Sequence, residues 1–201
     1  DVIAMASSGT GAMEAAVANT LSAGDTVLVL KAGKFGERFL ELCAAYGVKT
    51  IALEVPFGNT VPAARFAQAL EEHPGVRAVL MQHSESSTAV LHDVKGIAAV
   101  TRGTDKILIV DAVSSLGIAD LQMDAWGVDI VVSGSQKGLM LPPGLSFCAV
   151  SEKAWGHVKT SRLPKYYFDL QAERKWMDKN EPRFTPAVSI MVGLREVLRM
   201  I

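Results

Sequence analysis

Residues 107–137 read ILIVDAVSSLGIADLQMDAWGVDIVVSGSQK. This stretch contains two short apolar runs, Ile107–Val110 and Ile130–Val132, and each run passes directly into small, polar residues. A continuous apolar run of this length is typical of a strand that is buried on both faces of a parallel sheet. The stretch therefore predicts two strands of an α/β sheet, each ending in a polar segment.

The same pattern recurs along the whole chain. Further apolar runs, which we expect to be strands, lie at Val2–Met5, Val27–Leu30, Lys49–Leu53, Val76–Met81 and Ser146–Val150. Helical patterns, which we expect to be helices, lie at Gly11–Leu21, Phe35–Tyr46, Pro62–Glu72, Val94–Arg102 and Ser189–Ile201. Apolar strands that alternate with helices predict a largely parallel sheet with helices on both faces.

Composition excludes several classes of protein. The 201 residues are 49% hydrophobic and carry a formal net charge of −1, so neither a disordered chain nor a strongly basic nucleic-acid or membrane-surface binder is expected. No apolar run approaches the roughly 20 residues that cross a bilayer. The two cysteines, Cys43 and Cys148, lie in predicted regular elements, which favours buried, reduced thiols and a cytoplasmic location. Because the chain begins without Met and stops inside a predicted helix, we expect it to be one domain of a longer protein.

Four of the predicted strands end in small, hydroxyl-rich segments. These segments are Ala6–Gly11, Gln82–Thr88, Asp111–Ser115 and Ser133–Lys137. In open α/β sheets, ligands bind in the crevice beyond the carboxyl ends of the strands. If the four strands are parallel, their polar segments meet in one place, which is the predicted site.

Ser8-Gly9-Thr10-Gly11 opens a predicted helix. The free N–H groups and the positive end of such a helix bind anions, and glycine lets the backbone approach the ligand closely. We therefore favour a phosphate site here. The alternative is that Ser8 or Thr10 simply caps the helix.

Asp111 and Lys137 are the predicted catalytic residues. A carboxylate at the end of an apolar strand is costly unless it is paired, and one use for it is to face the ring nitrogen of a pyridine cofactor. A lysine among small and apolar residues is expected to be buried, and burial lowers the pKa of its amine so that it can attack an aldehyde. The alternatives are a cap for the next turn at Asp111 and a surface loop lysine at Lys137.

Taken together, these motifs resemble the class V aminotransferases, most closely the alanine–glyoxylate and serine–pyruvate type. The resemblance rests on the order and spacing of four segments along essentially the whole chain, namely Ser8–Ala16, His83–Thr88, Val110–Gly117 and Ser133–Lys137. It implies a three-layer αβα fold with a mainly parallel, seven-stranded sheet. It also implies that residues 1–201 are the large domain that binds pyridoxal 5′-phosphate (PLP), without the amino-terminal segment and the carboxyl-terminal small domain.

The resemblance implies a role for each matching residue. Lys137 would form a Schiff base with PLP and carry the substrate proton, and Asp111 would pair with the pyridine nitrogen. The cofactor's phosphate would lie among Ser8, Gly9, Thr10 and Gln136. Ser86 would lie near the phenolic oxygen, while Val113 and Phe35 would pack on the two faces of the ring. Thr185 would reach the phosphate of the neighbouring subunit in a homodimer, or else cap the last helix.

Other residues receive plainer interpretations. His83 and Glu85 are expected to be positioning or surface groups, and no metal site is expected. Arg162, Arg174 and Arg183 are expected to be exposed, so the arginine that binds the substrate carboxylate is expected to lie outside this chain.

Three functions remain open from the sequence. The first is an aminotransferase that moves an amino group from a small amino acid to an oxo acid. The second is another PLP reaction on the same fold, such as a lyase or cysteine desulfurase reaction; the position of the two cysteines in regular elements disfavours desulfuration. The third is a non-catalytic α/β subunit, because some proteins described as hydrogenase subunits resemble this family.

Overall fold

A computed structural model describes all 201 residues of the chain. The strands are β1 (Val2–Met5), β2 (Thr26–Lys31), β3 (Lys49–Glu54), β4 (Val76–Gln82), β5 (Ser84–Glu85), β6 (Val90–Leu91), β7 (Ile107–Asp111), β8 (Ile130–Gly134) and β9 (Ser146–Val150). The helices are α1 (Gly9–Thr20), α2 (Lys34–Ala45), α3 (Ala63–Glu72), α4 (Val94–Thr101), α5 (Met123–Trp126), α6 (Glu152–Thr160), α7 (Leu170–Met177) and α8 (Val188–Val197). None of these helices has the length and apolar character needed to span a membrane.

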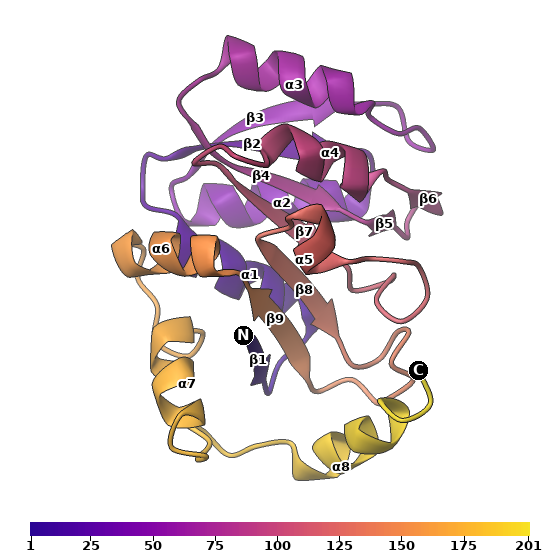
Figure 1. Cartoon of the computed structure of the whole chain (residues 1–201), viewed down its shortest axis with the longest axis vertical. Coiled ribbons are helices and arrows are strands. Elements are labelled where there is room, and N and C mark those ends of the chain that lie inside the picture. Colours follow the sequence, from indigo (N-terminus) through magenta and orange to yellow (C-terminus); the bar gives the residue numbers. More distant parts are fainter.

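Seven strands form one sheet in the order β1-β9-β8-β7-β4-β2-β3. The pairs β2–β3, β2–β4, β4–β7 and β7–β8 are parallel, whereas β9 runs antiparallel to both β1 and β8. Six strands therefore point the same way, and β9 alone is reversed. The remaining two strands, β5 and β6, form a small antiparallel hairpin beyond the end of β4 (Figure 1).

Two hydrophobic cores cover the two faces of the sheet. Alternate residues of each central strand face opposite cores: in β4, for example, Ala78 and Leu80 belong to one, and Val79 and Met81 to the other. The first core lies under α1, α2, α6 and α7, and the second lies under α3, α4 and α5 (Figure 1). Because both faces are covered, the central strands are apolar along most of their length, which explains the sequence pattern.

The predicted three-layer fold with a mainly parallel, seven-stranded sheet is confirmed. The differences lie in short elements. The β5–β6 hairpin and helices α5, α6 and α7 were not predicted. Helix α1 begins at Gly9 rather than Gly11, and α8 ends at Val197 rather than Ile201.

Gly36, in the first turn of α2, permits a close contact between that helix and β2. A Cβ atom at this position would lie 2.5 Å from the carbonyl oxygen of Leu30 and 2.9 Å from the Cα atom of Lys31. Both neighbours are backbone atoms, so they have little freedom to move away. We expect Gly36→Ala to lower the free energy of unfolding by about 1 to 3 kcal/mol, which denaturant titration measures.

Gly156, within α6, is the matched control for this substitution. No atom lies within 4 Å of a Cβ placed there. In this exposed position Gly156→Ala should stabilise the chain by roughly 0.5 to 1 kcal/mol, because alanine is the better helix former. Equal effects of the two substitutions would contradict the close approach of α2 to β2.

Candidate active site

The four polar segments lie at one edge of the sheet, as expected. Strands β1, β4, β7 and β8 point in the same direction, so their carboxyl ends lie on the same side. In Figure 1 the β5–β6 hairpin and the loops that follow β7 and β8 extend on this side of the molecule. The site is therefore built by segments from residue 6 to residue 137 that are distant in sequence and close in space.

Three of these segments meet in what we call the cradle, formed by Gly9, Val113, Gly134 and Gln136. A Cβ atom on Gly9 would lie 2.5 Å from Cγ2 of Val113, and one on Gly134 would lie 3.3 Å from the backbone nitrogen of Gly9. Glycine at both positions thus allows the start of α1 to approach the loops after β7 and β8. The Oε1 atom of Gln136 would lie 3.0 Å from the same Cβ atom on Gly134. This oxygen is buried and has no hydrogen-bond partner.

The hydroxyl groups beside the cradle already have local partners. Ser8 is the N-cap of α1, and its Oγ accepts a hydrogen bond from the backbone N–H of Gly11 at 3.4 Å. Thr10 Oγ1 accepts one from Nη1 of Arg38, on α2, at 3.2 Å. The capping alternative is therefore confirmed for Ser8. A cap and a phosphate site are compatible, because the remaining N–H groups of the first turn are free to bind an anion.

Asp111 ends β7 as a buried carboxyl group, with 3% of its surface exposed. Its Oδ1 accepts a hydrogen bond from the backbone N–H of Val113 at 2.8 Å, the kind of local turn that the sequence left as an alternative. The pKa of Asp111 is raised to about 6, mainly by burial and to a smaller extent by the nearby carboxylate of Glu85, although the hydrogen bond from Val113 acts in the opposite direction. The group has no cationic partner at hydrogen-bond distance within the chain, so it is suited to a cation supplied by a ligand.

Gln82 lies beside Asp111 in the parallel pair β4–β7. Its side chain is fully buried, and neither its Oε1 nor its Nε2 has a hydrogen-bond partner. Buried amides are almost always satisfied, so two unpartnered atoms next to Asp111 point to a polar group that binds here.

Lys137 follows Gln136 of the cradle directly, in the turn after β8, and its side chain is exposed. The expectation of a buried lysine was wrong. The small and apolar residues around it in the sequence pack elsewhere: Leu139, for example, joins a small core with Leu145, Phe147 and Val197. An exposed amine at this edge is accessible to an incoming aldehyde without any rearrangement of the core.

The residues expected around the cofactor ring lie on two elements. Phe35 is half-buried in the first turn of α2, and the guanidinium carbon of Arg38 lies 4.9 Å from the centre of its ring. Ser86 is exposed in the hairpin turn between β5 and β6. Val113 contacts Gly9 from the loop after β7, as described above.

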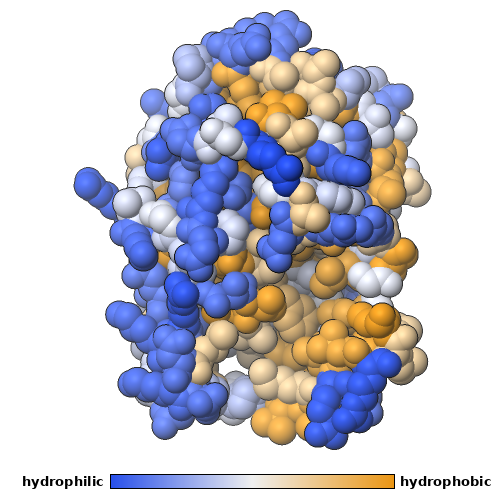
Figure 2. All heavy atoms as spheres, viewed as in Figure 1, coloured by the Kyte–Doolittle hydropathy of each residue, from blue (hydrophilic) through white to orange (hydrophobic).

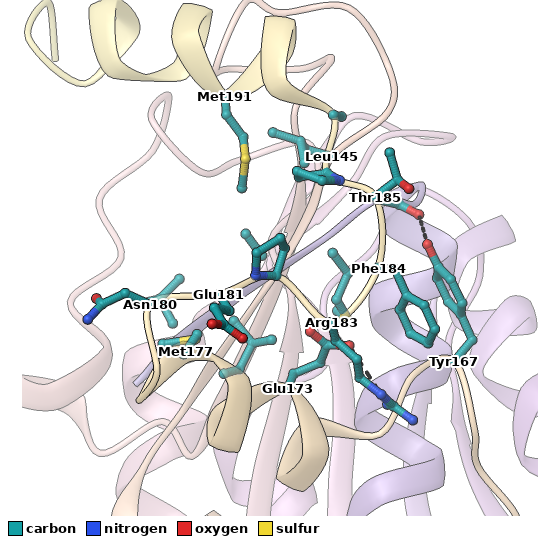
Figure 3. A pocket seen from close by; sticks show the side chains of 18 residues that line it. Leu145, Tyr167, Glu173, Met177, Asn180, Glu181, Arg183, Phe184, Thr185 and Met191 are labelled. Carbon is teal, nitrogen blue, oxygen red and sulfur yellow. Dashed lines mark hydrogen bonds and ion pairs between the residues drawn. The ribbon is translucent and has the colours of Figure 1, made fainter.

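Thr185 lies away from the cradle. It is exposed and lines a different cavity of about 520 Å³, between β1, the segment that connects α7 to α8, and the start of α8. No cradle residue lines this cavity. Figure 3 shows its aromatic side, where the rings of Tyr167 and Phe184 are stacked 4.6 Å apart.

Arg183, in the same cavity, corrects a further expectation. Its side chain is only 14% exposed, and its Nη1 lies 3.8 Å from Oε1 of Glu173. The guanidinium also lies over the rings of Phe184 and Tyr166, at 4.8 and 5.3 Å. It was expected to be exposed, but it is covered by the rings of Tyr166, which precedes it in the sequence, and Phe184, which follows it.

His83 and Glu85 are both buried, with 3% and 0% of their surface exposed. Burial lowers the pKa of His83, so it is neutral near pH 7. Glu85 accepts hydrogen bonds from the backbone N–H groups of Phe35 and Gly36 at 3.0 and 3.2 Å, which makes it a positioning group rather than a surface one. Arg38, Gln82 and this contact of Glu85 were not predicted from the sequence. The one sequence signal was Gly33-x-x-Gly36 at the start of α2, where Gly33 makes room for Glu85 and Gly36 lies close to Gln82.

Comparison with known proteins agrees with this arrangement. The model of the family described as aminotransferase class-V matches residues 1–201. An L-aspartate–glyoxylate aminotransferase of Paracoccus denitrificans is 44% identical over 94% of this chain and 48% of its own length. A protein named soluble hydrogenase 42 kDa subunit, from Anabaena cylindrica, is 46% identical over 100% of this chain and 53% of its own length.

Solved structures give the same result. The alanine–glyoxylate aminotransferase of a Nostoc species superposes with a TM-score of 0.92 and 35% identity, covering 100% of this chain and 54% of that one. The chain thus spans about half the length of the curated relatives it matches. The match over its full length, together with the fold, shows that this chain belongs to the class V aminotransferase family.

Proposed function

We propose that the protein is a PLP-dependent aminotransferase that moves an amino group from a small amino acid of the alanine or serine type to an oxo acid of the glyoxylate or pyruvate type. One observation carries the proposal: a glycine cradle at the start of a helix, a buried carboxyl group and an exposed lysine amine all lie at the same edge of the sheet. In this proposal, residues 1–201 form the large, cofactor-binding domain.

The residues present fit the phosphate end of PLP. Gly9 and Gly134 let the start of α1 approach the loops after β7 and β8 closely, and the Oε1 atom of Gln136 is buried beside them without a partner. The N–H groups of the first turn of α1 supply donors and a positive potential for an anion. Ser8, Thr10 and Gln136 would surround this phosphate, and Thr185 would reach the phosphate bound by a partner subunit.

The ring of PLP would lie between Val113 and Phe35, with Ser86 near its phenolic oxygen. When bound, PLP supplies an electron sink for the carbanion that forms when the substrate loses its Cα proton. Asp111 would keep the pyridine nitrogen protonated. Because burial costs an ionised carboxylate free energy, a cation beside Asp111 would be favoured strongly.

Lys137 would act through its Nζ atom. It would hold the cofactor covalently, and after release its free amine would take the proton from the substrate Cα and return it in the second half of the reaction. Its exposed position leaves the amine free to move between these tasks. No residue of this chain is proposed to bind the substrate carboxylate.

We also propose a homodimer. Exposed apolar residues gather on α8 and the end of the chain: Val188, Met191, Val192, Leu198, Met200 and Ile201. In Figure 2 apolar atoms lie above and beside a hydrophilic cluster in the lower right part of the face, whereas the side of α6 and α7 is mainly hydrophilic. A second subunit covering this surface would also bring Thr185 towards its partner's site. The two reduced cysteines favour a cytoplasmic location.

The cysteines argue against the desulfurase alternative. Cys43 and Cys148 are both buried, and burial raises the pKa of each thiol to about 12. A thiol needs its thiolate form and an accessible position to act as a nucleophile. Neither cysteine of this chain meets that requirement.

The test is direct. The protein at its full natural length is expected to become yellow with PLP and to convert alanine and glyoxylate into pyruvate and glycine, with serine and aspartate as further amino donors. Pyruvate and glycine are measured by chromatography. A protein that takes up no PLP would refute the proposal and favour a non-catalytic α/β subunit. Uptake of PLP with elimination products and no transamination would favour a lyase.

A further inference from the structure

The carboxylate of Glu85 joins two segments that carry predicted cofactor contacts. Its Oε2 accepts hydrogen bonds from the backbone N–H groups of Phe35 and Gly36, at 3.0 and 3.2 Å. Its Oε1 accepts two from Ser87, from the backbone N–H at 3.2 Å and from Oγ at 2.6 Å. Four hydrogen bonds therefore surround a carboxylate that is fully buried.

The start of α2 depends on this carboxylate. The N-cap of α2 is Gly33, which has no side chain to accept a hydrogen bond from the first turn. Glu85, about 50 residues later in the chain, takes that place, and its negative charge also interacts favourably with the positive end of the helix.

Glycine at position 33 makes room for this contact. A Cβ atom there would lie 2.5 Å from both Cγ and Cδ of Glu85. These atoms are part of the buried side chain, and its carboxylate is held by four hydrogen bonds, so the side chain has little freedom to move away. The geometry is thus specific to a side chain of this length that reaches α2 from the hairpin.

The hydrogen bonds to Glu85 fix the position of the Phe35 backbone. The backbone N–H of Phe35 is bound directly, and that of Gly36 is bound by the same oxygen, so the first turn of α2 has little freedom to rotate. The ring of Phe35 also packs against Arg38, whose guanidinium is bound to Thr10. Both ends of the Phe35 residue are therefore held, the backbone by Glu85 and the ring by Arg38.

We propose that Glu85 is a positioning residue that holds the ring of Phe35 at the distance and angle required to stack on the bound cofactor. The inference rests on the proposed function, because it assumes that PLP occupies the site. Glu85 itself does not touch the cofactor in this proposal; it acts on the cofactor ring through the backbone of Phe35.

Three variants of Glu85 separate geometry from charge. Glu85→Ala removes every acceptor. Glu85→Asp keeps the charge but withdraws the carboxylate by one methylene group. Glu85→Gln keeps the length and one acceptor oxygen for the Phe35 and Gly36 N–H groups. The matched control is Glu37→Gln, which removes a carboxylate from the same first turn of α2 where it is paired only with the exposed Lys34.

The first measurement needs no cofactor. Hydrogen exchange of the Phe35 and Gly36 amides in the full-length protein should accelerate at least about tenfold in Glu85→Ala and Glu85→Asp, and remain near wild type in Glu85→Gln and Glu37→Gln. The second measurement is titration with PLP, followed by absorbance and circular dichroism of the bound cofactor. The same two variants should bind PLP about 10 to 100-fold more weakly, with a changed dichroic band.

The third measurement tests the route through Phe35. In a Phe35→Leu background there is no aromatic ring to position, so Glu85→Asp should cause little further loss of PLP affinity. An equally large loss in both backgrounds would overturn the inference, as would wild-type PLP affinity in Glu85→Asp. These results are distinguishable from failure of the proposed function, in which the wild-type protein itself takes up no PLP and both proposals are refuted. Glu85→Asp serves in place of Glu85→Ala if the alanine variant does not fold.

Discussion

Replacing Lys137 by Ala is expected to abolish transamination and the covalent attachment of PLP. The amine is the group proposed to carry the substrate proton, and loss of a positioned acid–base group alone lowers a rate by about 10² to 10⁴-fold. The variant should fold normally, because the Lys137 side chain is exposed and makes no hydrogen bond or ion pair, and the hydrogen bond from the Met140 N–H to the Lys137 backbone carbonyl is kept in the variant. The measurements are steady-state turnover with alanine and glyoxylate, and mass spectrometry after borohydride reduction, which fixes any lysine-bound PLP to the peptide.

Lys159→Ala is the matched control, since this exposed lysine on α6 also lacks a partner. It should leave both turnover and labelling unchanged. Because position 137 is open to solvent, a small primary amine added to Lys137→Ala should restore part of the activity. Full activity in the unsupplemented variant, or PLP fixed to another lysine, would refute the assignment.

Asp111→Asn is expected to lower turnover by about 10² to 10³-fold, the usual cost of removing one preorganised electrostatic contact. Asparagine has nearly the same shape and can still accept the Val113 hydrogen bond, so PLP should bind with similar affinity. The loss should therefore appear in the rate of Cα proton removal, measured by deuterium exchange into alanine. An unchanged exchange rate would contradict the proposed pairing with the ring nitrogen.

Asp111→Asn is expected to lower turnover, but it should raise the free energy of unfolding of the protein without cofactor. The folded-state pKa of Asp111 is raised from 3.8 to about 6, so between these values the folded chain binds more protons than the unfolded chain. The free energy of unfolding therefore falls as the pH rises from about 4 to 6. Above pH 6, where Asp111 is ionised in the folded chain, its burial lowers the free energy of unfolding by the full amount of about 2 to 3 kcal/mol. Asp111→Asn should be more stable than the wild type by this amount at pH 8, and equally stable near pH 3.5. Denaturant titration at the two pH values checks the sign.

The sheet and its site edge could be predicted because their signal is strong and local. Strands such as β4 and β7 are covered on both faces, so each contains a run of at least four consecutive apolar residues, and the polar residue that ends each run, Gln82 or Asp111, marks the edge where ligands bind. The β5–β6 hairpin could not be predicted in this way. Its strands have two residues each, which is too short for any periodicity to be visible.

Features that depend on packing between distant segments were missed for a different reason. The exposure of Lys137 depends on where Leu139 and Leu145 pack, and the burial of Arg183 depends on rings contributed by Tyr166 and Phe184. Glu85 lies in a hydroxyl-rich segment and is indistinguishable from a surface residue until the position of α2 beside it is known. In each case the local sequence is compatible with either environment, and only the tertiary contact decides.

The reversed strand β9 has a consequence for the order of folding. Strand β1 pairs only with β9, through a register that joins Met5 to Ser146 and Val2 to Ala149. The loop from β1 to α1, which carries Ser8 and Gly9, therefore acquires its anchor only after β9, which lies more than 140 residues after β1 along the chain, has been synthesised. Contacts that close so long a segment form slowly. The nascent polypeptide should thus assemble its parallel strands first and acquire the capacity to capture an anionic ligand last.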